Sequence, residues 1–304
     1  MRTICLSNVR RMVPPLLSHF HKGQLGRLAV VGGCEDYTGA PFFSAHAAML
    51  LGCDLVHVIT EEGTAATVIK SYSPDLMVHP YLGNGFNLQK ITGVLDRMDA
   101  IVIGPGFGRS DAKLIELRAI LNYLNTEKRQ IPIVLDADAL YFLSLGHLND
   151  YINLKTILMP NVVEFARIRD GIDNSMNLQQ LSKHFECTIV EKGSIDSICF
   201  NGKDVVTVEE SGSLKRVGGQ GDTLSGLIGC MLAWGMGAYK KGIWEREEPI
   251  FTDDELVQLC CLGGAWLARR TGNQAYHKYG RSMLTSNLAE FIPSSWEQLK
   301  GDKY

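Results

Sequence analysis

The residues best suited to chemistry lie in one glycine-rich stretch, GSLKRVGGQGDTLSGLIG, at positions 212–229. Gly218, Gly219 and Gly221 remove side chains from a turn, so the backbone can approach another molecule closely or adopt a positive φ. Apolar residues after Asp222 recur at the spacing of a buried helix face. A glycine turn that opens a helix presents unpaired N–H groups and the positive end of the helix dipole. The stretch therefore predicts a binding site for an anion such as phosphate.

Asp222 would lie beside this anion site. Its carboxylate could take a proton from an attacking hydroxyl, which would make it a general base. Aspartate in the first turn of a helix is also a common cap. Taken alone, the stretch favours the cap.

The composition is that of an ordinary soluble globular protein. The 304 residues are 45% hydrophobic and 21% charged, with a net charge of −3. This balance gives no electrostatic reason to bind nucleic acid or an anionic membrane, and no apolar run is long enough to span a bilayer. The eight cysteines form no C-x-x-C pair and the eight histidines show no metal-ligand spacing. We expect reduced cysteines and a cytoplasmic protein.

The first 27 residues contain basic side chains and no acid. Such a segment could be a mitochondrial transit peptide. Pro14 and Pro15 would interrupt a long amphipathic helix, and serine is scarce. Mitochondrial import is therefore the alternative to a cytoplasmic location.

Short apolar runs alternate with helical patterns along the chain. Strands are predicted at 28–31, 55–60, 100–103, 131–135, 156–159 and 188–190, and a hairpin at 198–200 and 205–208. Helices are predicted at 41–51, 111–124, from 162, at 222–234 and at 254–270. This alternation predicts an α/β fold with a mostly parallel sheet covered on both faces, and a single domain over 1–304.

Six of the predicted strands or turns end in Gly, Asp, Asn, Lys or Glu. These residues lie at 32–33, 104–108, 136–138, 161–164, 192–196 and 218–222. In parallel sheets ligands bind outside the carboxyl ends of the strands. We therefore expect these segments to share one edge, although each could be a routine turn. Asp136 and Asp138 could line that site or cap the following helix.

Two familiar phosphate motifs are missing. No G-x-x-x-x-G-K-[ST] motif occurs, and GPGFGR at 104–109 does not match G-x-G-x-x-G. Hydride transfer on a dinucleotide-binding fold is therefore disfavoured.

Six ordered motifs carry a resemblance to a known family. They are KGQLGRLAVVGG, GPGFGR, VLDADAL, MPNVVEFARI, EKGSID and the stretch at 212–229. Together they resemble the ATP-dependent (S)-NAD(P)H-hydrate dehydratase family of the ribokinase-like superfamily, over about 22–234 and more faintly over the last helices, so over nearly the whole chain. The resemblance implies a three-layer α/β/α fold around a central, mostly parallel sheet.

The resemblance implies repair of hydrated NADH and NADPH (NADHX and NADPHX), with ATP as co-substrate and Mg²⁺ as cofactor. Asp222 would deprotonate the ring hydroxyl, whose oxygen would attack the γ-phosphate of ATP. The phosphorylated intermediate would then expel phosphate, because phosphate is a much better leaving group than hydroxide. A functional link to an NAD(P)HX epimerase is also implied, whereas neither the oligomeric state nor a preference between the two dinucleotides follows.

The resemblance also implies site residues. The catalytic residues would be Asp222, Gly219 and Gly221. The dinucleotide would contact Gly106, Asn161, Val162, Val163, Glu164, Phe165, Ala166, Arg167 and Asp222. ATP would contact Lys192, Gly193, Ser194, Ile195, Asp196, Gly212, Ser213, Leu214, Lys215, Arg216, Val217, Gly218, Gly219, Gln220 and Gly221. Glu164 would order Mg²⁺ through water, unless Asn161 and Glu164 merely form a turn and a helix start.

Two other functions remain open from the residues. A vitamin or sugar kinase of the same superfamily would use Asp222 and the glycine turn in the same way. A nucleotide-binding regulator could share the fold, but it would have no need of the base. We expect the carboxylate to favour an enzyme.

Overall fold

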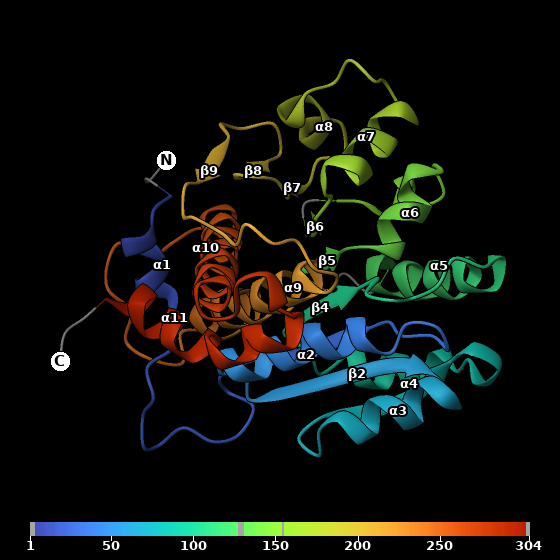
Figure 1. Ribbon diagram of the computed structural model, residues 1–304, viewed down its shortest axis with the longest axis horizontal. Helices are drawn as coiled ribbons and strands as arrows, with labels where there is room; N and C mark the ends of the chain where they lie inside the picture. The colour runs from blue at the N-terminus through green and yellow to red at the C-terminus, as the bar shows by residue number, and fades with distance from the viewer. Residues whose placement is uncertain (1–3, 127–130, 154, 302–304) are drawn as a thin grey trace.

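The computed structural model describes residues 4–126, 131–153 and 155–301 (Figure 1). Its described strands form one sheet in the order β3-β2-β1-β4-β5-β6-β7-β8-β9. The seven parallel strands are β1 (Arg27–Val31), β2 (Leu55–Glu61), β3 (Met77–Leu82), β4 (Ala100–Ile103), β5 (Ile133–Leu135), β6 (Thr156–Leu158) and β7 (Thr188–Glu191). The antiparallel strands β8 (Asp196–Phe200) and β9 (Val206–Val208) complete it. The mostly parallel sheet is confirmed.

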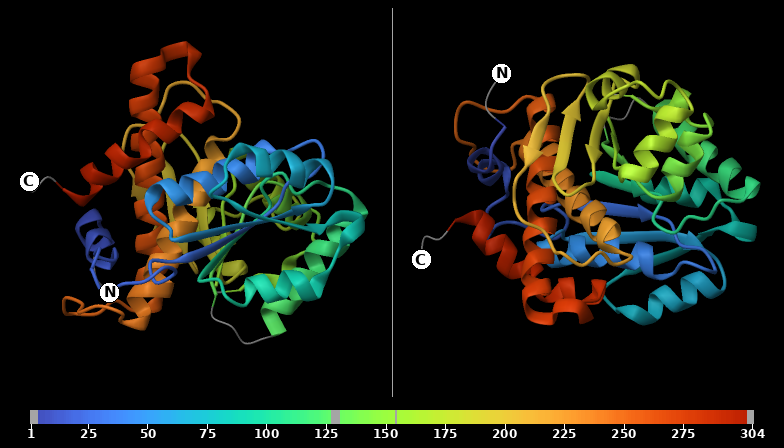
Figure 2. Two further views of the ribbon diagram at one scale, coloured as in Figure 1. Left: turned by 90° about the horizontal axis from the view of Figure 1, so that it is seen from below. Right: turned by 45° about the horizontal axis from the view of Figure 1, so that its top comes forward.

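Helices cover both faces of the sheet (Figure 2). One face carries α1 (Leu6–Met12), α2 (Gly39–Leu51), α3 (Thr64–Tyr72), α9 (Gln220–Leu232), the π-helical segment η3 (Ala233–Tyr239), α10 (Asp253–Tyr279) and α11 (Ile292–Lys300). The other carries α4 (Leu88–Leu95), α5 (Asp111–Thr126), α6 (Asp138–Ser144), α7 (Val162–Asp170) and α8 (Leu178–His184). This is the expected three-layer α/β/α fold.

Alternate residues of the central strands enter the two hydrophobic cores. In β1, Leu28 and Val30 pack in one core, whereas Ala29 and Val31 pack in the other. Successive side chains of a strand point to opposite faces, so a strand buried on both sides must be apolar throughout. The continuous apolar runs of the sequence therefore indicated the central strands correctly.

The elements that the sequence did not predict have weak local patterns. Strand β3 contains Pro80 and His79, and a proline normally argues against a strand. It is tolerated here because β3 is the edge strand and pairs with β2 alone. The helix predicted at 254–270 continues to Tyr279. The hairpin is confirmed, with Asn201 and Gly202 at positive φ in its turn.

Within the described residues, no helix combines the length and apolar character needed to cross a membrane.

Candidate active site

The N-terminus of α9 is the centre of the site. Gly219 is its N-cap residue, with φ 96°. A Cβ at Gly219 would lie 2.8 Å from the side chains of Phe43 and Thr285, so only glycine fits. A Cβ at Gly218 would meet open space, and one at Gly221 would lie 3.5 Å from Lys192 Nζ. The turn therefore requires glycine at Gly219 in particular.

The segment before α9 is held by the first residue of the helix. Gln220 Nε2 donates to Ser213 Oγ at 2.9 Å and to the Lys215 carbonyl at 3.4 Å. Its Oε1 accepts from the Val217 N–H at 3.3 Å. Thr285, at the start of the 3₁₀ segment η5 (Thr285–Glu290), donates to the Gly218 carbonyl. The turn is thus fixed from both sides.

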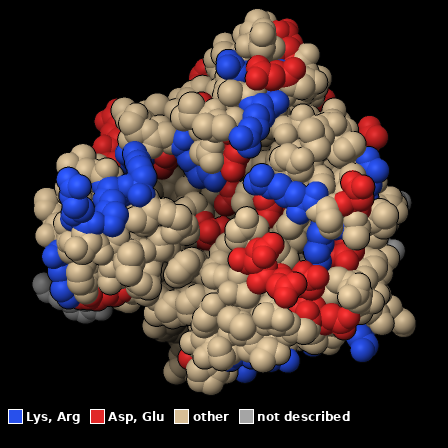
Figure 3. Space-filling view, turned by 45° about the vertical axis from the view of Figure 1, so that its right-hand side comes forward, with Lys and Arg blue, Asp and Glu red and all other residues tan. Residues whose placement is uncertain are grey.

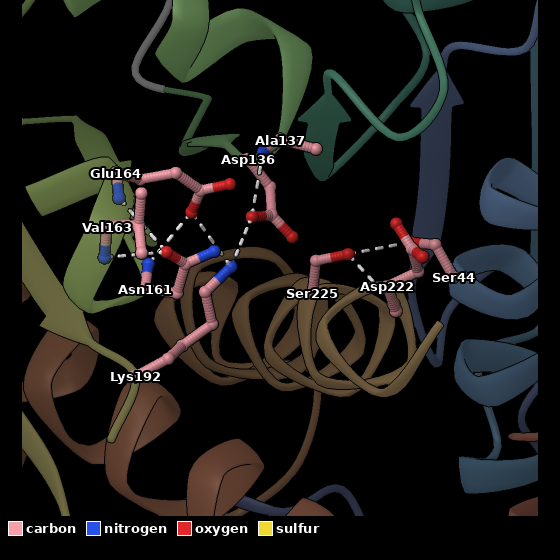
Figure 4. A network of polar contacts seen from close by, with 9 residues as sticks. All are labelled: Ser44, Asp136, Ala137, Asn161, Val163, Glu164, Lys192, Asp222 and Ser225. Atoms are coloured by element: carbon pink, nitrogen blue, oxygen red, sulfur yellow. Dashed lines mark hydrogen bonds and ion pairs between the residues drawn. The ribbon is translucent and has the colours of Figure 1, made fainter. Parts of the chain in front are cut away.

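Helix α9 lies directly on its neighbours. A Cβ at Gly226 would lie 1.9 Å from the Ser44 carbonyl oxygen of α2, and one at Gly229 would lie 2.9 Å from Leu28 of β1. Ser225 Oγ also lies 3.1 Å from Ser44 Oγ and donates to the Asp222 carbonyl at 2.8 Å (Figure 4). These contacts leave the helix no room to shift.

Asp222 does not serve as the helix cap. Gly219 holds the cap position of this helix, and no side-chain cap hydrogen bond occurs across the described residues 220–232. Burial, followed by repulsion from Asp136 and Asp138, raises the pKa of Asp222 to about 7, although Lys192 opposes this. A carboxylate with a pKa near 7 suits a general base at neutral pH. The structure therefore disfavours the cap interpretation.

Lys192 connects the end of β7 with the end of β5 (Figure 4). Its Nζ lies 2.6 Å from Asp136 Oδ1 and 3.7 Å from Glu164 Oε2. Burial lowers the pKa of Lys192, but Asp136 and Glu164 more than offset it, so the net pKa is raised. Its ammonium also faces Gly221 at the start of α9. A fixed positive charge therefore lies beside the glycine turn.

Asn161 and Glu164 form a capping box at α7. Asn161 Oδ1 accepts from the N–H groups of Val163 and Glu164, both at 3.0 Å. Glu164 Oε2 accepts from the Asn161 N–H at 2.8 Å. These contacts bear out the turn and helix-start interpretation of the pair. They leave Glu164 facing Lys192 at the margin of a cavity.

Two large cavities lie at the carboxyl edge of the sheet, the side that is hollowed in Figure 3. The first has a volume of about 770 Å³. It is lined by Asn161, Val162, Val163, Glu164, Arg167, Lys192, Gly193, Ser194, Asp196, Gly212, Ser213, Arg216, Val217, Gln220 and Gly221, with apolar residues of α9, α10 and η5. Most of the residues predicted for ATP therefore meet in one cavity.

The second cavity has a volume of about 670 Å³ and is lined by Gly106 and Asp222, among others. The residues predicted for the dinucleotide are therefore divided between the two cavities. Phe165 is buried in the core, and Ala166 lines neither cavity. Ile195, Leu214, Lys215, Gly218 and Gly219 also lie outside both linings.

The second cavity is lined by Asp138, which the sequence analysis named as a possible site residue, and by Arg109 and Lys113, which it did not single out. Asp138 accepts from Arg109 Nε at 2.6 Å and from the Gly108 N–H at 2.9 Å. Lys113 is buried, with its Nζ 3.5 Å from Glu61 and 3.3 Å from Glu116. Asp138 and Arg109 fall within quoted motifs, whereas nothing in the sequence pairs Lys113 with the end of β2.

The cavities meet at consecutive residues of α9, because Gly221 lines the first and Asp222 lines the second. An anion in the first cavity can reach the N–H groups and dipole of α9 and the Lys192 ammonium. A hydroxyl in the second can reach the Asp222 carboxylate. The fold and this arrangement define an α/β protein with two adjoining ligand-sized cavities at the carboxyl edge of its sheet.

Comparison with known proteins identifies the family to which this chain belongs. Residues 28–294 match the sequence model of a family described as NAD(P)H-hydrate dehydratase. The chain is 42% identical to the ATP-dependent (S)-NAD(P)H-hydrate dehydratase of Saccharomyces cerevisiae, over 96% of both chains. It is 38% identical to the enzyme of that name from Homo sapiens, over 97% of this chain and 84% of the human one. The chain belongs to the NAD(P)H-hydrate dehydratase family.

Solved structures agree on the fold. A ribokinase-like superfamily protein from Enterococcus faecalis superimposes with a TM-score of 0.76 at 22% identity, covering 97% of this chain and 95% of its own. An ADP/ATP-dependent NAD(P)H-hydrate dehydratase from Bacillus subtilis, co-crystallised with ATP and Mg²⁺, gives a TM-score of 0.71 at 20% identity, with 97% of each chain covered. The expected ribokinase-like fold is confirmed.

Proposed function

We propose that this protein uses ATP to dehydrate (S)-NADHX and (S)-NADPHX to NADH and NADPH, and that it releases ADP and phosphate. The observation that carries this proposal is the position of Gly221 and Asp222. They are consecutive in α9, yet they face different cavities. One cavity can therefore hold the phosphoryl donor while the other holds the acceptor.

We propose that ATP binds in the first cavity. Its phosphates would lie against the N–H groups of Gly219 and Gly221, where the helix dipole and Lys192 stabilise negative charge. The parts of 193–196 and 212–217 that line this cavity would surround the rest of the nucleotide, with Arg216 adding positive charge. The apolar side chains of Leu224, Ala268 and Leu288 line the same cavity and suit the adenine ring.

The hydrated nicotinamide is placed in the second cavity, beside Asp222 and Gly106. Gly106 has φ 59°, and a Cβ there would lie 2.7 Å from the Tyr37 carbonyl oxygen. Glycine is thus required by the close approach of Tyr37, and Gly106 itself lines the second cavity. Residues 161–164 and Arg167 would contact the dinucleotide where it reaches the first cavity. Phe165 instead packs in the hydrophobic core below α7, and Ala166 lines neither cavity.

We propose the following reaction. Asp222 takes the proton of the ring hydroxyl, and the oxygen attacks the γ-phosphorus of ATP as the bond to ADP breaks. The amide groups at Gly219 and Gly221 and the Lys192 ammonium stabilise the charge that develops on the transferring group. Phosphate then leaves with the electrons of the carbon–oxygen bond, and a proton is lost from the adjacent ring carbon, which restores the double bond of the dihydronicotinamide. Phosphorylation is needed because hydroxide is a poor leaving group.

The residues of this site fit a Mg²⁺ ion that binds together with the phosphates of the nucleotide. The described residues include no group of three or more His, Cys, Asp or Glu side chains that could hold a metal ion. Mg²⁺ commonly uses one or two carboxylates, water and substrate phosphates. Glu164, one of the two carboxylates that line the first cavity among the described residues, would hold it through water. Bound there, the ion would neutralise phosphate charge.

We further propose that the chain acts as one domain, because its described strands share one sheet. Its eight cysteines are free thiols, which suits a cytoplasmic location. Since the enzyme is expected to act on the S epimer, an epimerase would supply that form from the R epimer.

The test mixes the purified protein with hydrated NADH, ATP and Mg²⁺. The absorbance of the dihydronicotinamide should return, and phosphate should be released in equal amount. A kinase would instead accumulate a stable phosphorylated product. Failure to regain the absorbance with either hydrated dinucleotide would overturn the proposed function.

A further inference from the structure

Arg269 of α10 joins the two segments that are proposed to surround ATP. Its side chain is only 9% exposed. Arg269 Nε donates to the carbonyl of Glu210 at 2.5 Å, and Nη2 donates to the carbonyl of Ser194. Nη1 lies 3.1 Å from Asp196 Oδ1 and 3.5 Å from the Gly193 carbonyl oxygen. One guanidinium therefore connects the turn after β7 with the segment after β9.

Asp196 is the centre of this arrangement. Its Oδ1 accepts from the Gly193 N–H at 3.0 Å, which closes the turn at 193–196, and the same oxygen faces Arg269. The Asp196 side chain is 7% exposed, so its charge has little contact with water. A buried carboxylate left without its partner is strongly unfavourable. The pair therefore holds this turn in one conformation.

The donors of Arg269 are directed to the protein rather than to a ligand. Four contacts use its fork of five N–H groups, and their partners are three carbonyls and one carboxylate. Gly212 packs over the guanidinium, where a Cβ would lie 3.8 Å from Cζ. Arg269 lines the first cavity, yet its N–H groups donate to the loops around that cavity.

We propose that Arg269 is a positioning residue for ATP, and that it fixes residues 193–196 and 210–212 at the spacing that the nucleotide needs. The inference rests on the proposed function for the identity of the ligand. Lysine carries the charge but lacks the planar fork, so it can satisfy only part of this set. Each segment contributes lining residues to the first cavity, so a substitution at Arg269 should change the binding of ATP alone.

The experiment compares Arg269→Ala and Arg269→Lys with Arg270→Ala. Arg270 is the next residue of α10, and it contacts the Glu210 side chain and Gln298 rather than the loop backbone. The KM for ATP should rise about 10- to 100-fold in Arg269→Ala and less in Arg269→Lys, because displaced ligand-positioning groups cost effects of that size. The KM for hydrated NADH, and kcat at saturating ATP, should stay close to the wild-type values. Arg270→Ala should match the wild type in all three.

A second measurement separates this inference from the proposed function. ATP affinity is determined by calorimetry in an Asp222→Asn background, with and without Arg269→Lys, so no turnover is required. Weaker ATP binding in the double variant, at an unchanged melting temperature of the wild-type and Arg269→Lys proteins, supports the positioning role. Unchanged ATP affinity, or a parallel rise in both KM values, would overturn it. Failure of the wild type to turn over hydrated NADH would instead count against the proposed function alone.

Discussion

The two cavities differ in how their charges are arranged. The first presents the backbone N-terminus of α9, basic side chains and a partly apolar wall. The second presents side-chain carboxylates and their partners, including Asp222, Asp138 and Arg109. Backbone amides suit a phosphate of fixed geometry, whereas side chains can recognise a particular acceptor. This difference supports the proposed binding of the phosphoryl donor in the first cavity and of the acceptor in the second.

The largest expected effect is a loss of kcat without a loss of ATP affinity, caused by a substitution at the N-terminus of α9. Asp222→Asn should lower kcat by about 1,000-fold or more, because general-base catalysis contributes up to about 10⁴-fold. ATP affinity should persist, since the residue faces the other cavity. Steady-state kinetics and nucleotide titration check both points. Loss of ATP binding together with activity would show that the two cavities are not separate in function.

The next effect concerns the backbone of the first cavity. Gly219→Ala should weaken ATP binding and slow turnover by about 100-fold, because its φ of 96° and its contacts with Phe43 and Thr285 exclude a Cβ. Gly218→Ala is the matched comparison, since its Cβ would enter open space. We expect a much smaller loss there, measured in the same assay. Equal losses in both variants would contradict a specific requirement at Gly219.

A smaller effect, on the KM for hydrated NADH, is expected from a substitution in the second cavity. Arg109→Gln removes the partner of Asp138, and the Arg109 side chain is 52% exposed, so the fold should survive. We expect the KM for hydrated NADH to rise about three- to tenfold with the KM for ATP unchanged, as for loss of one exposed charged contact. Arg118→Gln on α5 is the control, because Arg118 bonds the His147 carbonyl outside both cavities. A rise in the KM for ATP alone would assign Arg109 to the donor.

The smallest effect is on stability. The folded protein raises the pKa of Asp222 to about 7, so the native state holds this proton over a pH range in which the unfolded chain, with a pKa of about 4, has lost it. This carboxyl group therefore destabilises the fold as the pH rises from about 4 to about 7. Asp222→Asn should melt a few degrees higher than the wild type at pH 8, with the difference shrinking towards pH 4. A constant difference across this range would contradict the raised pKa.

The sequence predicted the elements with strong local patterns and missed the division of the site. The glycine turn, the apolar strands and the hairpin depend on nearby residues, so they could be recognised directly. Placing Gly106 apart from Asn161 depends on strand order. Gly106 follows β4, next to β1, whereas Asn161 forms a bridge with Lys192 at the ends of β6 and β7. No local pattern in one sequence indicates which strands are neighbours.

The same limit explains the missed residues. Lys113 looks like an ordinary helix lysine in the sequence, and only the packing of α5 beside the end of β2 brings it to Glu61. The sequence left Asp136 open as either a site residue or a helix cap, and its contact with Lys192 from another strand end could not be read from the sequence. The family motifs contained Asp136, Asp138 and Arg109, but their partners became evident only from the structure.

The close packing of α9 through Gly226 and Gly229 has a consequence for turnover. Because α9 packs tightly between α2 and the sheet, its amide dipoles are already aligned before either ligand binds. The free-energy cost of aligning them is therefore met during folding rather than in each catalytic cycle. Enlarging Gly226 would therefore harm the chemical step from a distance, by tilting the helix end away from both reactants.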